Sequence, residues 1–303
     1  MFRLLARWLD NSRSEALVAA GSRRIDLGRI VPFIGLHLAC AAVIWVGVST
    51  TALVICAVSY LLRMFAITAF YHRYFAHRTF RAGRVAQFVF ALLGATATQR
   101  GPLWWAAHHR SHHRHADQPG DPHRPADGLF WSHVGWFLSD RHFAADPGLV
   151  RDWRRFPELV WLDRFDLVVP VLYATALFGL GAWLGARFPA LETGGWQVLV
   201  WGYVVSTVLL IHATLLVNSL AHVWGHRRFA TGDDSRNNAV IALLTLGEGW
   251  HNNHHRYASS ARQGFYWWQI DPSFWLLRLL AAMGVVQGLR GVPADVLVEG
   301  RRR

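Results

Sequence analysis

Residues 50–77 read TTALVICAVSYLLRMFAITAFYHRYFAH, an apolar run that passes directly into two histidines, His72 and His77. The apolar part, residues 50–71, has the length of about 20 residues that a helix needs to cross a bilayer. Histidine is a common metal ligand, and polar groups of this kind seldom gather at a membrane helix without a function. The stretch therefore predicts a membrane-spanning helix that ends in a metal site.

Three further apolar runs of similar length occupy residues 29–46, 167–186 and 196–217. Hydrophobic residues make up 53% of the chain and its mean hydropathy is +0.19, which is high for a soluble protein. Buried core helices of a soluble protein are the alternative, but the length and low charge of the runs favour membrane spans. The close spacing of the runs predicts an all-α integral membrane protein with four transmembrane helices in two hairpins.

The arginines predict the orientation of these hairpins, because the chain contains no lysine. Neither hairpin link is rich in positive charge: the first has none, and the second has only Arg187. The positive-inside rule then places the N-terminus, residues 72–165 and residues 218–303 in the cytosol. These cytosolic segments are expected to form a helical cap. The N-terminal arginines that support this orientation are Arg3, Arg7, Arg13, Arg23, Arg24 and Arg29.

Two more histidine clusters lie on the predicted cytosolic side: His109-Arg-Ser-His112-His113 and His251-Asn-Asn-His254-His255. On a helix, residues three and four apart share a face, so each cluster forms one imidazole patch. Neighbouring residues diverge by about 100°, so the adjacent histidines of a patch can reach two metals side by side. His72 and His77 are five residues apart and, on a straight helix, are also expected to reach two different ions.

The ligand type limits the metal without choosing it. The two cysteines, Cys40 and Cys56, fall inside predicted spans and are expected to be small apolar residues rather than ligands. Calcium and magnesium prefer oxygen ligands, whereas nitrogen-rich sites suit iron, copper, nickel and zinc. The residues alone therefore predict a site for two transition-metal ions.

The formal charge of +12 and the pI near 11 raise the question of nucleic acid as a partner. The arginines flank predicted spans and no nucleic-acid-binding motif is present, so we expect no nucleic acid partner. Attraction to anionic membrane lipid explains the charge better, and an acidic redox partner would also fit. Without an internal repeat or long linker, residues 1–303 are expected to form a single domain.

The histidine clusters and their surroundings resemble the integral-membrane fatty acid desaturases, specifically the acyl-CoA Δ9 (stearoyl-CoA) type. The resemblance covers roughly residues 30–270. The matching segments are His72-Arg-Tyr-Phe-Ala-His77-Arg-Thr-Phe-Arg-Ala82, Trp105 with the second cluster, Asp121-Pro-His123, Ser132-His-Val-Gly-Trp136, Asn218-Ser-Leu-Ala-His222, and Gly247-Glu-Gly-Trp-His251 with the third cluster.

This resemblance implies a cytosol-facing site with two iron ions, held by nine histidines and, through water, by Asn218. Glu248 and Asp121 are candidates for orienting the ligands, although helix-end or loop charges are the alternative. His108 departs from the family, which has an acidic residue there, and it offers a second register for the middle cluster. We keep His109 as the ligand. The implied ligands are His72, His77, His109, His112, His113, His222, His251, His254 and His255.

The resemblance also implies the reaction: with O2 and two electrons, a cis double bond is inserted into a saturated acyl chain. Gln99, Trp105 and Thr214 match the family residues that fix a bend in that chain. Tyr60 and Met64, one turn apart on the second span, are predicted to limit chain length; ordinary packing or lipid contact is the alternative. The other histidines are expected to be non-ligands, with His123, His133 and His226 as candidates for an acyl headgroup pocket; this set also includes His37, His115, His142 and His212.

The chain has no electron-carrier motif, so a separate donor is expected, either a b-type cytochrome or a ferredoxin-like protein with its reductase. The acyl carrier is expected to be CoA, with a phospholipid or carrier protein as alternatives. A membrane hydroxylase or alkane monooxygenase is the closest rival function, and a metal transporter is a more distant one. The arginine-only, alanine-rich composition is typical of a GC-rich bacterial genome and predicts the inner membrane.

Overall fold

The computed structural model describes residues 9–11 and 23–302. Arg3, Arg7 and Arg13, which contributed to the predicted orientation, lie outside the described residues. Nearly all described secondary structure is helical, in agreement with the expected fold class. The exception is a small antiparallel sheet in which β1 (Arg81–Ala82) pairs with β2 (Val286–Gln287), so the chain is mostly helical rather than entirely so.

Within the described residues, four helical segments are long and apolar enough to cross a membrane: Leu27–Val46, Thr50–Ala76, Val168–Arg187 and Gly195–His222. They confirm the four predicted runs, but the second and fourth segments continue about five residues further than the hydropathy pattern indicated. The second continues into the first histidine cluster, and the fourth ends at His222. These segments are built from α2 (Leu27–Ala39), η3 (Cys40–Ala42) and α3 (Val43–Val46); α4 (Thr50–Phe65) and η4 (Ala66–Ala76); α10 (Val168–Arg187); and α11 (Gly195–Leu199), η10 (Val200–Val205), α12 (Ser206–Asn218) and η11 (Leu220–His222).

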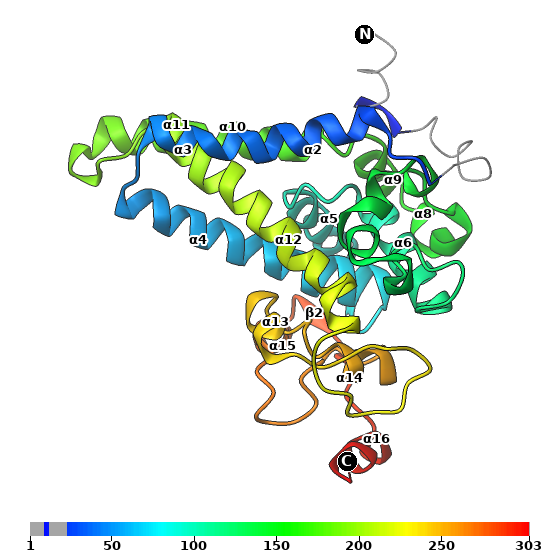
Figure 1. Cartoon of the computed structure of the whole chain (residues 1–303). Coiled ribbons are helices and arrows are strands. Elements are labelled where there is room, and N and C mark those ends of the chain that lie inside the picture. Colours follow the sequence, from blue (N-terminus) through cyan, green and yellow to red (C-terminus); the bar gives the residue numbers. More distant parts are fainter. Residues whose placement is uncertain (1–8, 12–22, 303) are drawn as a thin grey trace.

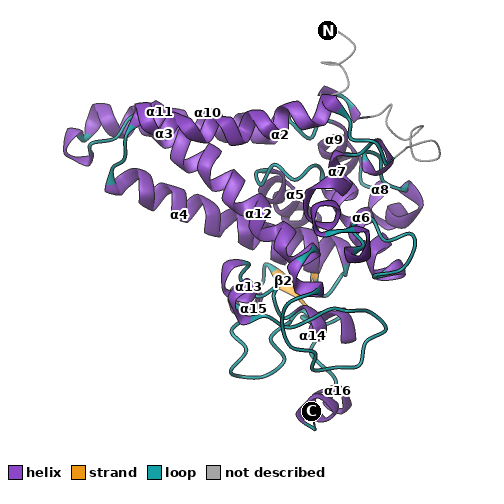
Figure 2. Cartoon of the chain, in the orientation of Figure 1, coloured by secondary structure: helices purple, strands orange, loops and turns teal. Residues whose placement is uncertain are grey.

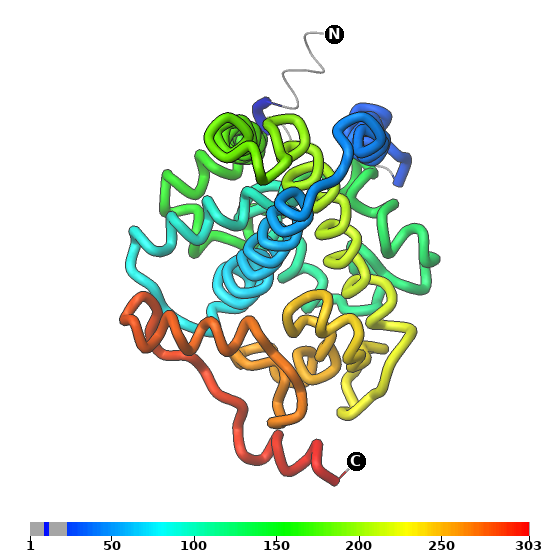
Figure 3. The backbone as a smooth tube through the Cα atoms, turned by 90° about the vertical axis from the view of Figure 1, so that its left-hand side faces the viewer, coloured from blue at the N-terminus to red at the C-terminus, as the bar shows by residue number. Residues whose placement is uncertain are grey.

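The four long segments extend to one end of the molecule, where the turns that join them in sequence lie together (Figure 1). Figure 3 looks at the molecule from this end. At that end, the first and last segments are tied by side chains: Gln197 Nε2 donates to the Val46 carbonyl at 3.0 Å, and Trp201 Nε1 donates to the Gly47 carbonyl at 2.9 Å. The remaining helices gather at the other end (Figure 2).

The helices outside the long segments are short, and most of them lie in two parts of the chain, residues 84–164 and 239–301. Polar side chains cap the start of three of them. Asn238 Oδ1 accepts from the backbone N–H of Val240 and Ile241, Asp271 Oδ1 accepts from that of Phe274, and Asp146 Oδ1 accepts from that of Gly148. These helices are α5 (Arg84–Ala95), α6 (Pro102–His115), η5 (Pro125–Asp127), η6 (Trp131–Gly135), α7 (Trp136–Leu138), η7 (Asp140–His142), η8 (Pro147–Val150), α8 (Arg151–Arg154), α9 (Pro157–Arg164), η9 (Pro189–Leu191), α13 (Ala239–Leu244), α14 (His251–Arg256), α15 (Pro272–Ala282) and α16 (Ala294–Arg301).

The burial of the long segments is uneven. Every residue of η4 is buried, and η4 contributes much of the main hydrophobic core, including Phe70, Tyr71 and Phe75. In α2, by contrast, no residue is buried within the chain. His72 of the first histidine cluster therefore lies on a helix whose described residues are all buried. Packing on all sides of this helix restricts the orientation of the His72 ring.

Candidate metal centre

Nine histidines converge in two groups, and within each group the facing ring nitrogens lie within 4.8 Å of one another. We call them the five-histidine group and the four-histidine group. They come from η4 and the residue that follows it, His77, and from α6, η11 and α14, which are far apart in the sequence. The five-histidine group is His72, His77, His109, His113 and His254, and the four-histidine group is His112, His222, His251 and His255.

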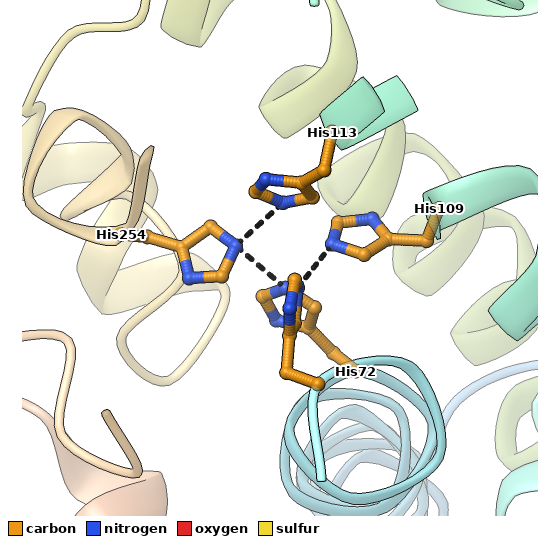
Figure 4. Close-up of side chains that lie close together, drawn as sticks. His72, His109, His113 and His254 are labelled. Carbon is orange, nitrogen blue, oxygen red and sulfur yellow. Dashed lines mark hydrogen bonds between the residues drawn. The ribbon is translucent and has the colours of Figure 1, made fainter. Parts of the chain in front are cut away.

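Four rings of the five-histidine group, those of His72, His109, His113 and His254, face a common point (Figure 4). His254 Nε2 lies 2.8 Å from His113 Nε2 and 3.1 Å from His72 Nε2. Two nitrogens that bind one metal at right angles, each at about 2.1 Å, lie about 3.0 Å apart. The spacing of these ring nitrogens therefore fits ligands of one metal ion.

The four-histidine group has the same character. His222 Nε2 lies 3.0 Å from His251 Nε2, and His112 Nε2 lies 3.3 Å from His255 Nε2. All the facing atoms in these contacts are Nε2. Nine buried or half-buried imidazole nitrogens in two such groups form a donor set that suits transition-metal ions.

The two H-x2-H-H clusters divide between the groups as their helical geometry predicted. His112 and His113 belong to different groups, and so do His254 and His255. In each cluster the first and last histidines, four residues apart on one helix face, share a group. The expectation that adjacent histidines reach two neighbouring positions is confirmed by the placement of the side chains.

The expectation for His72 and His77 was wrong, because both lie in the five-histidine group, with ring centroids 4.8 Å apart. The reason is that η4 is a π-helix, not a straight α-helix. The His77 N–H donates to the His72 carbonyl at 3.2 Å, an i→i+5 hydrogen bond that brings residues five apart onto one face. Such π-turns are frequent at functional sites.

Four carboxylates accept hydrogen bonds or lie in ion-pair contact at the outward Nδ1 atoms of the histidines. Two of them, Glu248 and Asp121, were predicted, whereas Asp117 and Asp233 were missed. Because a carboxylate holds the proton at Nδ1, it leaves Nε2 free to bind a metal. The contacts are Glu248 with His72, Asp121 Oδ2 with His112 Nδ1 at 3.0 Å, Asp117 Oδ2 with His222 Nδ1 at 3.0 Å, and Asp233 Oδ2 with His255 Nδ1 at 2.9 Å.

The carboxylates stay ionised in this setting. Burial would raise the pKa of Asp121, but the neighbouring His112 and His123 hold it well below its usual range. The same balance of burial against a histidine partner lowers the pKa of Asp233. Burial lowers the pKa of His255 to about 4, so this ring is neutral at neutral pH, as a metal ligand must be.

Glu248 differs from the other three carboxylates because it forms an ion pair with an arginine, Arg73, which also pairs with Asp271. The buried Arg73 lies between it and a second carboxylate: Arg73 Nη2 is 3.2 Å from Glu248 Oε1 and 2.9 Å from Asp271 Oδ1. Gly247, with φ +124°, makes room for this cluster, since a Cβ atom there would lie 2.5 Å from Asp271 Oδ1. The first cluster is thus braced by a buried ion network.

His108, the alternative ligand in the middle cluster, lies outside both groups. Its ring packs against Trp104 and Trp136, with centroid distances of 4.4 and 5.6 Å. It is buried rather than solvent-facing, and its Nε2 atom makes no hydrogen bond within the described part of the chain. The geometry therefore favours the register that uses His109.

A cavity of about 240 Å³ lies beside the five-histidine group, and we call it the main cavity of this site. A smaller inner cavity continues from it, since both are lined by Trp105, His109, Thr214 and Asn218. Of the three histidines considered for an acyl headgroup pocket, His123 lines the main cavity, whereas His133 and His226 line neither of these two cavities. An apolar cavity that ends at a cluster of imidazoles can hold an extended hydrocarbon chain against a metal.

The three residues predicted to fix a bend in a bound chain lie together on the wall of the main cavity. Gln99 Nε2 donates to Thr214 Oγ1 at 3.0 Å, and Trp105 Nε1 donates to Gln99 Oε1 at 3.4 Å. Met64 lines the inner cavity. Tyr60, one turn away, does not line it; its hydroxyl donates to the Leu244 carbonyl at 2.6 Å.

Three of the remaining histidines form a hydrogen-bonded chain that the sequence did not predict. His37 Nε2 lies 2.9 Å from His212 Nε2, and His133 Nε2 lies 2.9 Å from His212 Nδ1. His133 Nδ1 lies 3.0 Å from Ser219 Oγ. Because the rings use opposite nitrogens in succession, they join three segments of the chain rather than surround a common point.

Comparison with known proteins extends these observations. A family model described as fatty acid desaturase matches residues 34–288. The chain is 35% identical to an acyl-CoA 5-desaturase of Anemone leveillei (89% of this chain, 81% of that protein). It is also 35% identical to an sn-2 palmitoyl-lipid 9-desaturase of Nostoc sp. (76% and 78%) and 37% identical to delta-9 acyl-lipid desaturase 2 of Arabidopsis thaliana (76% and 71%). These matches confirm the resemblance predicted from the histidine clusters.

Proposed function

Because the chain belongs to the fatty acid desaturase family, we propose that it is an O2-dependent di-iron enzyme that inserts a cis double bond, at the Δ9 position, into a saturated fatty acyl chain. Family membership makes the protein an oxidoreductase. The observation that carries the finer proposal is the pair of histidine groups at the end of an apolar cavity.

In this proposal the nine grouped histidines hold two iron ions, and Asn218 approaches one of them through water. Both cavities reach Asn218, which supports its position near the reacting centre. When bound, iron supplies the oxygen activation and hydrogen abstraction that no amino-acid side chain provides. The four carboxylates keep the Nδ1 protons of His72, His112, His222 and His255 in place, so that the facing Nε2 atoms of these rings remain available.

The remaining work of the protein is placement. A saturated chain has no polar handle at its reacting methylenes, so its position must be set by the shape of the cavity. We propose that the bonded set of Gln99, Trp105 and Thr214 holds a bend in the acyl chain beside His109. Met64 and Tyr60 would then limit the length of the acyl chain beyond the reacting carbons. Met64 would do so as part of the wall of the inner cavity, and Tyr60 through its hydrogen bond to the Leu244 carbonyl.

The reaction removes two hydrogens from adjacent methylenes and, with two electrons and two protons, reduces O2 to two waters. In this proposal the electrons come from a separate protein, a b-type cytochrome or a ferredoxin-like donor with its reductase. We propose acyl-CoA as substrate, as in the name of the Anemone relative; the Nostoc and Arabidopsis names instead support a lipid-linked acyl chain. Residues 1–303 would act as one domain.

We propose a multi-pass protein of a bacterial inner membrane, with both termini and the metal centre in the cytosol. The four apolar segments support this, because their joining turns lie together at the end away from the histidines (Figure 1). A test of membrane side is cysteine labelling in intact cells at Thr193, in the second turn, and at Gly291, near the C-terminus. The proposal expects an impermeant reagent to label position 193 and not 291; the reverse pattern would refute it.

The activity is tested by product analysis in a host that expresses the wild type or His254→Ala. The proposal expects a new monounsaturated fatty acid with the wild type alone, bound to CoA or to membrane lipid. A hydroxylated chain as main product would instead show a hydroxylase. Metal transport across vesicles without oxygen consumption would show a transporter.

A further inference from the structure

The two histidine groups differ in the negative charge that surrounds them. In the described part of the chain, three of the four rings of the four-histidine group have a carboxylate at Nδ1, supplied by Asp117, Asp121 and Asp233. One ring in the five-histidine group has such a partner, Glu248 on His72. The larger group therefore has more nitrogen donors and fewer carboxylates.

Compensation by cations widens this difference. Arg73 lies beside Glu248 and offsets its charge. No arginine forms an ion pair with Asp117, Asp121 or Asp233 among the residues that the structure describes. Backbone N–H groups also donate to these carboxylates: Asp234 to Asp117 at 2.6 Å, Asp117 to Asp121 at 2.9 Å, and Ser235 to Asp233 at 3.0 Å. His123 Nδ1 lies 3.6 Å from Asp121 Oδ1, whereas Arg124 and Arg227 donate to the backbone carbonyls of Asp117 and Asp233 and not to their carboxylates.

These three carboxylates are held by geometry specific to the site. Asp117 and Asp121 come from the loop that follows α6, and Asp233 comes from the loop between η11 and α13. The Asp117 carboxylate also joins the two loops, because Oδ2 contacts His222 and accepts from Asp234. Both loops thus present charge to the four-histidine group and not to its neighbour.

Negative charge near a metal stabilises its higher oxidation state, and a carboxylate on Nδ1 makes the opposite ring nitrogen a stronger donor. We propose that Asp117, Asp121 and Asp233 make the two metal positions unequal, so that the iron in the four-histidine group is oxidised before the iron in the five-histidine group. This inference rests on the proposed di-iron function and assigns these residues as positioning residues for one iron.

The test uses the whole protein loaded with 57Fe and reduced anaerobically, then titrated with a one-electron chemical oxidant. Mössbauer spectra report ferrous and ferric iron separately in the two positions. Variants His77→Ala and His251→Ala, each lacking a ligand of one group, assign the signals. The inference expects the first ferric iron in the four-histidine group, with ferric-to-ferrous ratios that differ by at least about tenfold, about 59 mV for a one-electron couple.

Two matched variants then separate the carboxylates. Asp233→Asn keeps the size of the side chain but removes its charge, so it should reduce the difference in ferric-to-ferrous ratio between the two iron positions. Glu248→Gln should increase this difference. If Asp233→Asn loses iron, the inference expects selective loss from the four-histidine group, and equal loss from both groups contradicts it.

The outcomes separate this inference from the function on which it rests. First oxidation in the five-histidine group, simultaneous oxidation, or equal shifts in both variants would overturn the proposed inequality while leaving the di-iron enzyme intact. A wild-type protein that folds and binds no iron would instead contradict the proposed function.

Discussion

Replacing Thr214 with valine tests whether the polar set beside His109 controls where the double bond is placed. The change keeps the shape of the side chain and removes its hydroxyl. Thr214 Oγ1 accepts from Gln99 Nε2 at 3.0 Å and donates to the Leu210 carbonyl at 3.0 Å. In the variant, Gln99 Nε2 loses this acceptor.

A donor without a partner costs about 1–3 kcal/mol when it is buried, and the half-buried Gln99 falls toward the lower end of this range. A difference of about 1.4 kcal/mol corresponds to a tenfold change in an equilibrium. If the wall of the cavity distinguishes neighbouring methylenes by energies of this size, Thr214→Val should change the ratio of positional isomers by about tenfold. The assay is mass spectrometry of the double-bond position in fatty acids from expressing cells.

Thr175→Val is the matched control. Thr175 Oγ1 also donates to the carbonyl four residues earlier, Val171, at 2.9 Å, but it lies exposed on α10. The control should leave the isomer ratio unchanged. If Thr214→Val lowers total activity with the same isomer ratio as the wild type, the set does not fix the register of the chain, and our assignment of Gln99, Trp105 and Thr214 is wrong.

Further predictions concern the metal, the folding equilibrium and the cavity. His109→Gln should lose iron from the purified protein, whereas His108→Gln should retain two irons per chain; equal iron loss in metal analysis would reopen the alternative register. Burial raises the pKa of the Asp163 carboxyl group from 3.8 to about 6. Between these two pH values the folded state keeps the proton that the unfolded state has lost. The free energy of unfolding should therefore fall by about 3 kcal/mol as the pH rises from about 4 to about 6. Thermal melts of Asp163→Asn should lack this fall, and an identical pH profile would argue against it. His212→Phe removes two inter-ring hydrogen bonds and should lower the melting temperature by several degrees, since each costs about 1 kcal/mol; no change would show that the histidine chain adds no stability. Tyr60→Ala should extend the accepted chain length, and an unchanged length profile would remove Tyr60 from the proposal.

Hydropathy and histidine spacing predicted the four long helices and the division of each H-x2-H-H cluster, because both depend on simple periodicities. The prediction that His72 and His77 reach different metal ions was wrong. It was made for an α-helix, whereas η4 forms i→i+5 hydrogen bonds. No local pattern distinguishes a π-helix from an α-helix in this segment. All eleven of its residues are buried within the folded chain, and the sequence pattern does not specify these contacts.

The carboxylates show a second limit. Asp121 and Glu248 lie in the family motifs and could be proposed from them, but Asp233 stands in a polar loop, Thr231-Gly-Asp-Asp-Ser235, with no helical register. Its contact with His255 depends on how that loop folds over α14. The hydrogen-bonded series of His37, His133 and His212 could not be predicted for the same reason. These residues lie about 80 or more positions apart in the sequence and meet only in the folded protein.

The most direct test of the central claim is the product that the purified, iron-loaded protein forms from a saturated acyl substrate with O2 and a supplied electron donor. We predict a cis-monounsaturated chain that has lost two hydrogens, formed only when iron, O2 and reductant are all present. A product that has gained one oxygen, or the same product from iron-free protein, would contradict the account.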